Sequence, residues 1–121
     1  MKAVASVVDQ YLTTHSRCVV LCDYYDEVTG LSAALTSPHL LYTGQQQQQE
    51  AVEGWLEGKG EGVLVTTDHL FRGCEARAVV EVDRYGRWWR RSATTRAVAA
   101  LLLIASDKYI TCDVYKYFDQ F

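Results

Sequence analysis

Arg17-Cys18-Val19-Val20-Leu21-Cys22-Asp23 is the stretch that decides the fold of this chain. Its five central residues are all apolar, without the alternation of a half-exposed strand, and the run is short for a helix. This pattern is typical of a strand buried on both faces of a parallel sheet. Upstream, residues 2–14 carry apolar side chains at the spacing of one helical face, namely Val4, Val7, Val8, Tyr11 and Leu12. We therefore predict a helix followed by a buried strand.

The alternation of helix and strand continues after this strand. Asp26 is the expected N-cap of a second helix that runs through Leu35 and stops at Ser37-Pro38. Further strands are predicted over residues 39–42, 63–66, 78–82 and 101–104. Two more helices are predicted over residues 46–57 and 94–99, the first of which should bury Ala51, Val52, Trp55 and Leu56.

Strands that alternate with amphipathic helices predict an α/β fold. We expect a three-layer αβα arrangement around a doubly wound, mostly parallel sheet of about five strands. The 121 residues, of which 49% are hydrophobic, suffice for one core, so residues 1–121 are interpreted as a single domain. The aromatic tail, residues 109–121, is expected to pack on this domain, either as a final strand or as a segment across the sheet. The glutamine run at residues 45–49 is interpreted as solvated helix surface.

The composition excludes two broad classes of protein. A net charge of −3 and a pI near 5.5 argue against a protein that holds nucleic acid over its whole surface, because such proteins are usually basic. The longest apolar stretch, residues 97–105, is far shorter than the ~20 residues of a membrane span. We therefore expect no membrane association and, at most, a local basic patch.

The cysteines and histidines do not form a recognisable framework. Cys18, Cys22, Cys74 and Cys112 lie in or beside apolar runs without a CxxC pair, and the three histidines are scattered. A zinc site would need a cluster at ligand spacing, and a disulfide scaffold would follow a secretory leader, which is not apparent. We therefore expect reduced thiols, no bound metal and an intracellular protein, cytoplasmic or nuclear.

Two short stretches carry the functional signal. The first, Thr67-Asp68-His69-Leu70-Phe71-Arg72-Gly73-Cys74-Glu75, lies between two predicted strands. It resembles motif V of UvrD-like superfamily 1 helicases, Thr-x-His-x-x-Lys-Gly-x-Glu, and shares its Thr, Phe, Gly and Glu with the related RNA-helicase branch. The second, Ala93-Thr94-Thr95-Arg96-Ala97, precedes an apolar strand and is similar to motif VI, Ala-x-Thr-Arg-Ala. Their order and their separation by one strand agree with the family.

The resemblance is to the C-terminal RecA-like domain of these helicases and covers most of the chain before the aromatic tail. In such motors ATP lies between two RecA-like domains, and the second domain supplies an arginine to the γ-phosphate. The resemblance implies that Arg96 is this arginine finger, and that Gly73 and Glu75 contact the nucleotide. It implies that Thr67 and His69 face single-stranded nucleic acid. Both stretches should then converge at the carboxyl ends of the strands.

The sequence also departs from the family. It contains no GxxxxGK[ST] phosphate loop, and its only Gly-Lys pair, Gly58-Lys59, falls in a helix-ending turn. Arg72 replaces the usual lysine and Ala76 the usual aromatic residue. We therefore expect no cofactor in the isolated chain and no self-sufficient ATPase. ATP and Mg²⁺ would bind only if a partner supplied a phosphate-loop domain.

A basic and aromatic segment follows the strand 78–82. Trp88 and Trp89 are flanked by arginines at positions 84, 87, 90 and 91. Arg87, Trp88, Trp89 and Arg90 are a candidate stacking platform for bases or, alternatively, a contact surface for a protein partner. We favour the partner, because Trp and Arg are enriched among the residues that dominate protein interfaces. The motif residues also have structural interpretations: Arg96 as a solvated or carboxylate-paired helix residue, Glu75 as a cap of the following turn and His69 as a satisfied polar residue.

Three functions remain open on these residues. The first is a non-catalytic helicase-like domain that serves as a protein-interaction or regulatory module, with a protein partner or a second copy of itself. The second is half of a split motor that contributes Arg96 in trans to a phosphate-loop partner. The third is a weak, salt-sensitive binder of single-stranded nucleic acid. We rank them in this order, because the phosphate loop is missing and the overall charge is acidic.

Overall fold

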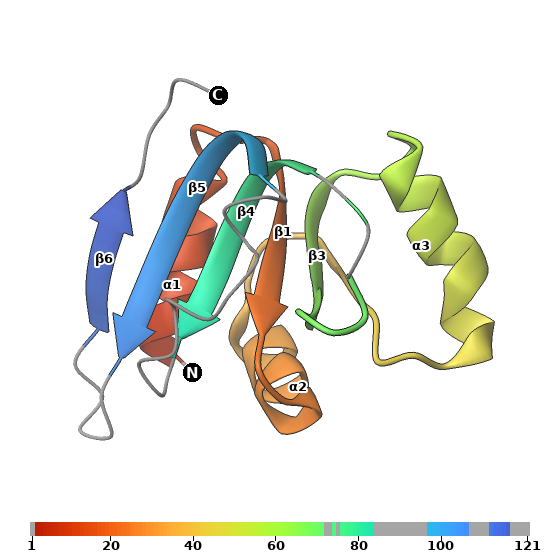
Figure 1. Ribbon diagram of the computed structural model, residues 1–121, viewed down its shortest axis with the longest axis horizontal. Coiled ribbons are helices and arrows are strands. Elements are labelled where there is room, and N and C mark those ends of the chain that lie inside the picture. The colour runs from red at the N-terminus through yellow and green to blue at the C-terminus, as the bar shows by residue number, and fades with distance from the viewer. Residues whose placement is uncertain (1, 72–73, 75, 84–96, 107–111, 117–121) are drawn as a thin grey trace.

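Six strands form one sheet in the order β2-β3-β1-β4-β5-β6. The computed structural model describes residues 2–71, 74, 76–83, 97–106 and 112–116, the last two ranges and residue 83 by their backbone alone. The helices are α1 (Lys2–Tyr11), α2 (Tyr25–Ala34) and α3 (Gln49–Leu56), with the 3-10 turn η1 (Gln46–Gln48) before α3. The strands are β1 (Arg17–Cys22), β2 (His39–Leu41), β3 (Gly62–Thr67), β4 (Ala76–Asp83), β5 (Ala97–Ser106) and β6 (Cys112–Lys116). Figure 1 shows their arrangement.

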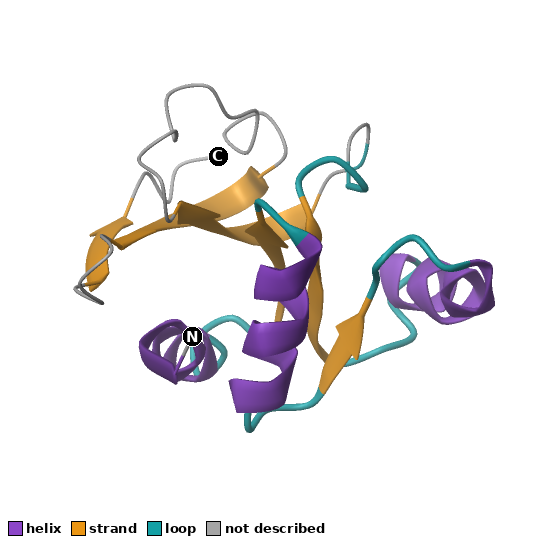
Figure 2. Ribbon diagram, turned by 90° about the horizontal axis from the view of Figure 1, so that it is seen from below, coloured by secondary structure: helices purple, strands orange, loops and turns teal. Residues whose placement is uncertain are grey.

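The predicted fold class is confirmed: the chain is an α/β domain with a mostly parallel sheet. β1 lies in the centre, parallel to β3 on one side and to β4 on the other. β2 and β5 extend the parallel sheet outward, and only the edge strand β6 is antiparallel. α1 and α2 cover one face of the sheet, whereas α3 lies on the side of the other face (Figure 2). The result is a three-layer, doubly wound arrangement.

β1 is buried on both faces, as its apolar run predicts. Its side chains alternate between two cores: Cys18, Val20 and Cys22 join the core under α1 and α2, whereas Val19 and Leu21 join the core on the α3 side. All five are at most 1% exposed. Burying a side chain of this size contributes about 1.5–3 kcal/mol, so this strand is a major source of stability.

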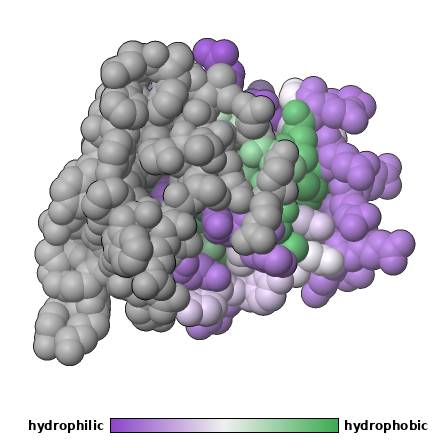
Figure 3. All heavy atoms as spheres, viewed as in Figure 1, coloured by the Kyte–Doolittle hydropathy of each residue, from purple (hydrophilic) through white to green (hydrophobic). Residues whose placement is uncertain are grey.

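The core on the α3 side is smaller. Val52 and Trp55 of α3 pack with Leu64 of β3 and with Phe71 from the loop that follows β3. In Figure 3 apolar residues gather between β3 and α3, and the outer surface of α3 is hydrophilic. α3 therefore touches the sheet through a narrow stripe. The prediction that Ala51 and Leu56 are buried is wrong, since both are exposed.

One further prediction is corrected at the C-terminal half. A helix over residues 94–99 was expected, but residues 97–99 already belong to β5, which lies beside β4 from the register pair of Ala97 with Ala76 onward. Strand pairing overrides the helical preference of alanine. The predicted sheet of about five strands has six, because the tail contributes β6. Of the two readings of the tail, the final strand is confirmed for residues 112–116.

The start of α2 also differs from the expectation. Asp26 was predicted to be the N-cap, but the cap position is Tyr24, and Asp26 lies in the first turn. The capping group is the carboxylate of Glu27, which accepts hydrogen bonds from the backbone N–H of Asp23 at 3.1 Å and of Tyr24 at 3.0 Å. An acid three residues into a helix can satisfy the cap in this way even when the cap residue itself is apolar.

The glutamine run also has a local role beyond helix surface. Gln48 is partly buried, and its Oε1 atom accepts the N–H of Thr43 at 2.8 Å and that of Gln45 at 3.3 Å. The other glutamines of the run are exposed. One member of the run therefore closes the loop between β2 and α3.

No helix among the described residues is long and apolar enough to cross a membrane.

Candidate functional site

The strands β1 and β3 are neighbours whose connections leave on opposite faces of the sheet. The chain after β1 enters α2, which packs on the face of α1. The chain after β3 passes over the other face, where Phe71 packs against β1 and β3. At this point the N–H of Asp68 donates to the carbonyl of Cys22 at 3.1 Å. Such a divergence of adjacent parallel strands is where open α/β sheets bind ligands.

We call this region the carboxyl edge, meaning residues 23–27 after β1, residues 42–48 after β2 and residues 67–71 after β3. The three segments are connected to one another. Thr66 donates its hydroxyl proton to the carbonyl of Tyr42 at 3.0 Å. Leu70 lies against Gly44, close enough that a Cβ on that glycine would stand 3.4 Å from it. The carboxyl edge is therefore a single, continuous surface at the lower end of Figure 1.

The first turn of α2 is occupied by the protein's own acid. The Glu27 side chain is 2% exposed and accepts the two N–H groups at the helix start described above. Helix N-termini attract anions because their N–H groups are unsatisfied and the helix dipole is positive there. Here the Glu27 carboxylate bonds the N–H groups of the two residues that precede α2, so an incoming phosphate would meet a negative charge beside the helix start.

Thr67 is a structural residue of the loop. It is 3% exposed, its Oγ1 atom accepts the N–H of Leu70 at 3.2 Å, and its carbonyl accepts the N–H of Phe71 at 3.2 Å. These bonds close the turn that carries Phe71 into the core. The predicted contact of Thr67 with nucleic acid would have to compete with this turn, because a hydroxyl buried in a bond to backbone offers little to a ligand.

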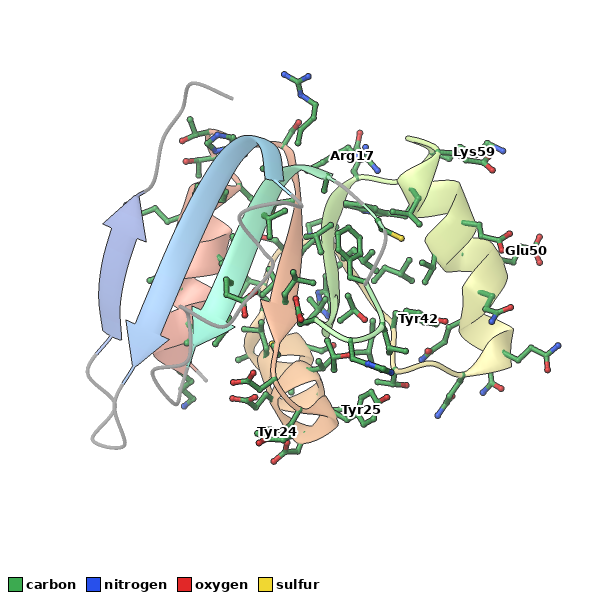
Figure 4. All side chains as sticks on the ribbon, in the orientation of Figure 1. Arg17, Tyr24, Tyr25, Tyr42, Glu50 and Lys59 are labelled. Atoms are coloured by element: carbon green, nitrogen blue, oxygen red, sulfur yellow. The ribbon has the colours of Figure 1, made fainter. Side chains whose placement is uncertain are left out.

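His69 lies at the tip of the same turn and is exposed. Two large side chains on the neighbouring turn are exposed as well, Tyr24 by 46% and Tyr25 by 50%. Both project from the start of α2 at the lower end of the sheet, away from the strands (Figure 4). Together with Leu56 of α3 they are the exposed large hydrophobic residues of the described chain.

Four carboxylates gather close to the carboxyl edge, and the sequence interpretation missed them as a group. Asp23 and Asp68 directly follow β1 and β3, and Glu27 accepts the backbone N–H groups of Asp23 and Tyr24. Glu81 is 1% exposed and lies in β4, in register with Leu21 of β1. The acids directly after β1 and β3 are a signal that the sequence did contain. Among the described residues no group of three or more His, Cys, Asp or Glu side chains is arranged to hold a metal ion.

Most of the other predicted site residues lie outside the described residues: Gly73, Glu75, Arg87, Trp88, Trp89, Arg90 and Arg96. Ala76 and Ala97 are register partners at the amino ends of β4 and β5, whereas Thr67 lies at the carboxyl end of β3. Because Gly73, Glu75 and residues 94–96 lie outside the described residues, the expected convergence of the two stretches at the carboxyl edge stays a prediction.

The cysteines that can be assessed are ordinary thiols. Cys18 and Cys74 form no disulfide, and burial raises the pKa of the Cys18 thiol to about 12. A thiol with so high a pKa is not a nucleophile at neutral pH.

Comparison of the sequence with protein-family models and with curated proteins gives no match. The resemblance to helicases therefore depends on the two short stretches and on the class of fold.

Proposed function

We propose that this chain is a helicase C-terminal-like α/β domain that works as an intracellular protein-interaction module, and that it does not hydrolyse ATP. The observation that carries the proposal is the turn between β1 and α2. There the Glu27 carboxylate accepts the N–H groups of Asp23 and Tyr24, and the large exposed side chains are the aromatic pair Tyr24 and Tyr25.

The chemistry of this turn favours a protein partner over a nucleotide. Asp26, which is exposed, places a negative charge at the turn where phosphate groups would have to approach. Tyrosine, by contrast, is enriched in protein interfaces because it offers a large apolar surface with a polar end. The absence of a phosphate-loop pattern in the sequence supports the same conclusion.

The catalytic side of the proposal is tested by ATP turnover. The purified chain, alone and with single-stranded DNA or RNA, should release no phosphate above the rate of the buffer, and Mg·ATP should leave its melting temperature unchanged. Arg96→Ala is the matched variant, because Arg96 is the arginine that the helicase resemblance selects. Turnover that is present in the natural sequence and lost in Arg96→Ala would refute the proposal in favour of a motor.

The interaction side is tested by site-specific crosslinking. A photoreactive phenylalanine derivative replaces Tyr25 in one sample and Glu57 in another, since both side chains are largely exposed and Glu57 lies beyond the end of α3. A discrete protein adduct from position 25 and none from position 57 is expected after irradiation in cells. Adducts of equal strength from both positions, or none from position 25, would contradict an interface at the carboxyl edge.

A further inference from the structure

The side chain of Asp9 joins α1 to the segment between α2 and β2. Each of its carboxylate oxygens bonds one of two successive residues. Oδ2 accepts the N–H of Thr36 at 3.2 Å and its hydroxyl at 2.8 Å. Oδ1 accepts the N–H of Ser37 at 3.1 Å and its hydroxyl at 2.5 Å, which is short even for a hydroxyl that donates to a carboxylate. We call these four hydrogen bonds the Asp9 latch.

A second negative charge at Ser37 would conflict with the latch. Burial acts to raise the pKa of Asp9, but hydrogen bonds from Ser37 and Thr36 lower it below the ordinary value of 3.8, so Asp9 is ionised at neutral pH. Residues 3–16 and 18–58 contain no lysine or arginine. An anionic group on the Ser37 hydroxyl would therefore be repelled by Asp9, and these two stretches offer no basic side chain to offset the repulsion.

The segment that carries Ser37 is accessible to a modifying enzyme. It lies between the end of α2 and the start of β2, where Thr36 and Pro38 are exposed and Ser37 is partly exposed. The backbone is extended at Leu35, with φ −70° and ψ 139°, and the proline favours an extended conformation at the serine before it. Such a segment can enter an active site without the unwinding of a helix or strand. Because the chain has a single proline, Ser37 is its only hydroxyl residue followed by proline.

We propose that Ser37 is a phosphorylation site for a proline-directed serine/threonine kinase, and that its phosphorylation opens the Asp9 latch. The γ-phosphoryl group of ATP is transferred to Ser37 Oγ: the O–P bond forms, the bond from the γ-phosphorus to the oxygen of the leaving ADP breaks, and the hydroxyl proton passes to the base of the kinase. A hydrogen-bond donor is thereby replaced by a group with a charge of about −1.5 to −2 beside a carboxylate. The consequence is a loosened α1, whose buried face is apolar. This inference goes beyond the proposed function and does not depend on it.

The site is tested by incubating the whole chain with Mg·ATP and a purified kinase of this class, followed by mass spectrometry of the chain and its peptides. One phosphate is expected, on Ser37, and none in Ser37→Ala. Asp9→Ala should be phosphorylated about fivefold faster, because the hydroxyl no longer has to leave Asp9. Thr13→Ala is the matched control: it removes a hydroxyl that bonds the carbonyl of Gln10 and should leave the rate unchanged. A chain without phosphate on Ser37 would overturn the site, and an unchanged rate in Asp9→Ala would overturn the latch.

Hydrogen exchange measured by mass spectrometry then tests the opening. In the phosphorylated chain the amides of α1 should exchange about tenfold or more faster than in the unmodified chain, whereas those of α3, which packs in the other core, should not change. Asp9→Asn removes the charge but keeps an acceptor, so phosphorylation of this variant should accelerate exchange in α1 much less. Unchanged exchange of α1 after phosphorylation, or equal acceleration in Asp9→Asn, would refute release by repulsion. Neither result bears on ATP turnover or on crosslinking from position 25, so this inference and the proposed function fail separately.

Discussion

The two ends of the sheet differ in the aromatic side chains that they leave exposed. At the amino edge, where β1, β2 and β3 begin, Arg17 donates to the carbonyl of Gly60 at 2.9 Å and to that of Trp55. At the carboxyl edge Glu27 and Thr66 also bond backbone groups, but Tyr24, Tyr25 and His69 are exposed. The comparison teaches that side chains hold elements together at both edges, whereas the carboxyl edge also leaves exposed aromatic surface.

Charges of both signs lie at the amino edge. Arg17, Lys59 and Arg77 lie close to the amino ends of β1, β3 and β4, and the acids Glu57 and Glu61 also precede β3. In the described turns after β1 and β3, by contrast, the charged side chains are the acids Asp23, Asp26, Glu27 and Asp68. A phosphate-binding α/β protein instead attracts anions at the carboxyl ends of its strands.

The largest expected effect is at Gly62, which begins β3 at the amino edge. Its φ is +82°, and an added Cβ would overlap the carbonyl oxygen of Pro38. Gly62→Ala should lower the free energy of unfolding by about 3 kcal/mol or more, because a strained backbone and a backbone clash add together. Chemical denaturation monitored by circular dichroism measures the change.

Gly54→Ala is the matched control for that substitution. Gly54 lies inside α3, and an added Cβ would have nothing within 4 Å. The same change of residue should therefore raise stability by about 0.5–1 kcal/mol through helix propensity. Similar destabilisation by the two alanines would show that the amino edge is not specially constrained.

Arg17→Lys tests the side-chain clamp at the amino edge. The guanidinium stacks over the ring of Trp55, 4.1 Å from its centroid, while it donates to the two carbonyl groups. Lysine keeps the charge but lacks the fork, so we expect a loss of about 2 kcal/mol from the free energy of unfolding. Lys59→Ala should change it by less than about 0.5 kcal/mol, because the ion pair of Lys59 with Glu57 is exposed. Equal effects of the two substitutions would contradict the clamp.

Asp9 gives the amino edge a pH dependence. Burial raises the pKa of Asp9, but hydrogen bonds from Ser37 and Thr36 outweigh this, so its pKa lies below the ordinary value of 3.8. A lowered pKa in the folded state contributes stability that is complete well above 3.8 and is lost as the pH falls through the folded pKa. Asp9→Asn should lower the free energy of unfolding by about 1 kcal/mol at neutral pH. The difference in the free energy of unfolding between Asp9→Asn and the natural sequence, measured by denaturation at several pH values, should become smaller below pH 4. A difference that stays constant down to acid pH would refute this role of Asp9.

The smallest effect is expected at the carboxyl edge. His69→Ala removes an exposed side chain at a loop tip and should change the free energy of unfolding by less than about 0.5 kcal/mol. Urea denaturation at neutral pH measures the free energy of unfolding of His69→Ala and of Arg17→Lys under the same conditions. A destabilisation of 2 kcal/mol or more at His69 would abolish the distinction between a structural edge and a binding edge.

The same two regions show where the sequence was informative. Strands with continuous apolar runs, such as Cys18–Cys22 and Val63–Thr66, were predicted at their correct places, because burial on both faces leaves a pattern that no other element shares. The run at residues 97–106 was assigned partly to a helix, since alanine favours helices until a neighbouring strand, here β4, pairs with its segment. Ala51 and Leu56 were assigned to the core because the spacing of apolar residues predicts which face of a helix is apolar. It does not predict how many residues of that face touch the sheet.

The candidate site was predicted less well than the fold. Thr67 and His69 were placed correctly after a strand, but the burial of Thr67 in a backbone turn depends on its bond to Leu70. The exposed pair Tyr24 and Tyr25 was not selected at all, because tyrosine after a buried strand is as compatible with a core as with a surface. The role of Glu27 as a cap, which turns the start of α2 from an anion site into an acidic one, was likewise visible only once α2 was placed.

The sequence by itself determined that this chain is a parallel α/β domain without a phosphate loop, because apolar strands, amphipathic helices and a missing motif are local properties of the residues. The tertiary structure decided the strand order and the parallel pairing of β1, β3, β4 and β5, which bring together segments that are distant in the sequence. It also decided that acids and tyrosines meet at the carboxyl edge. Residues 24 and 68 are far apart in the chain, and only the divergence of β1 and β3 brings their turns onto one surface.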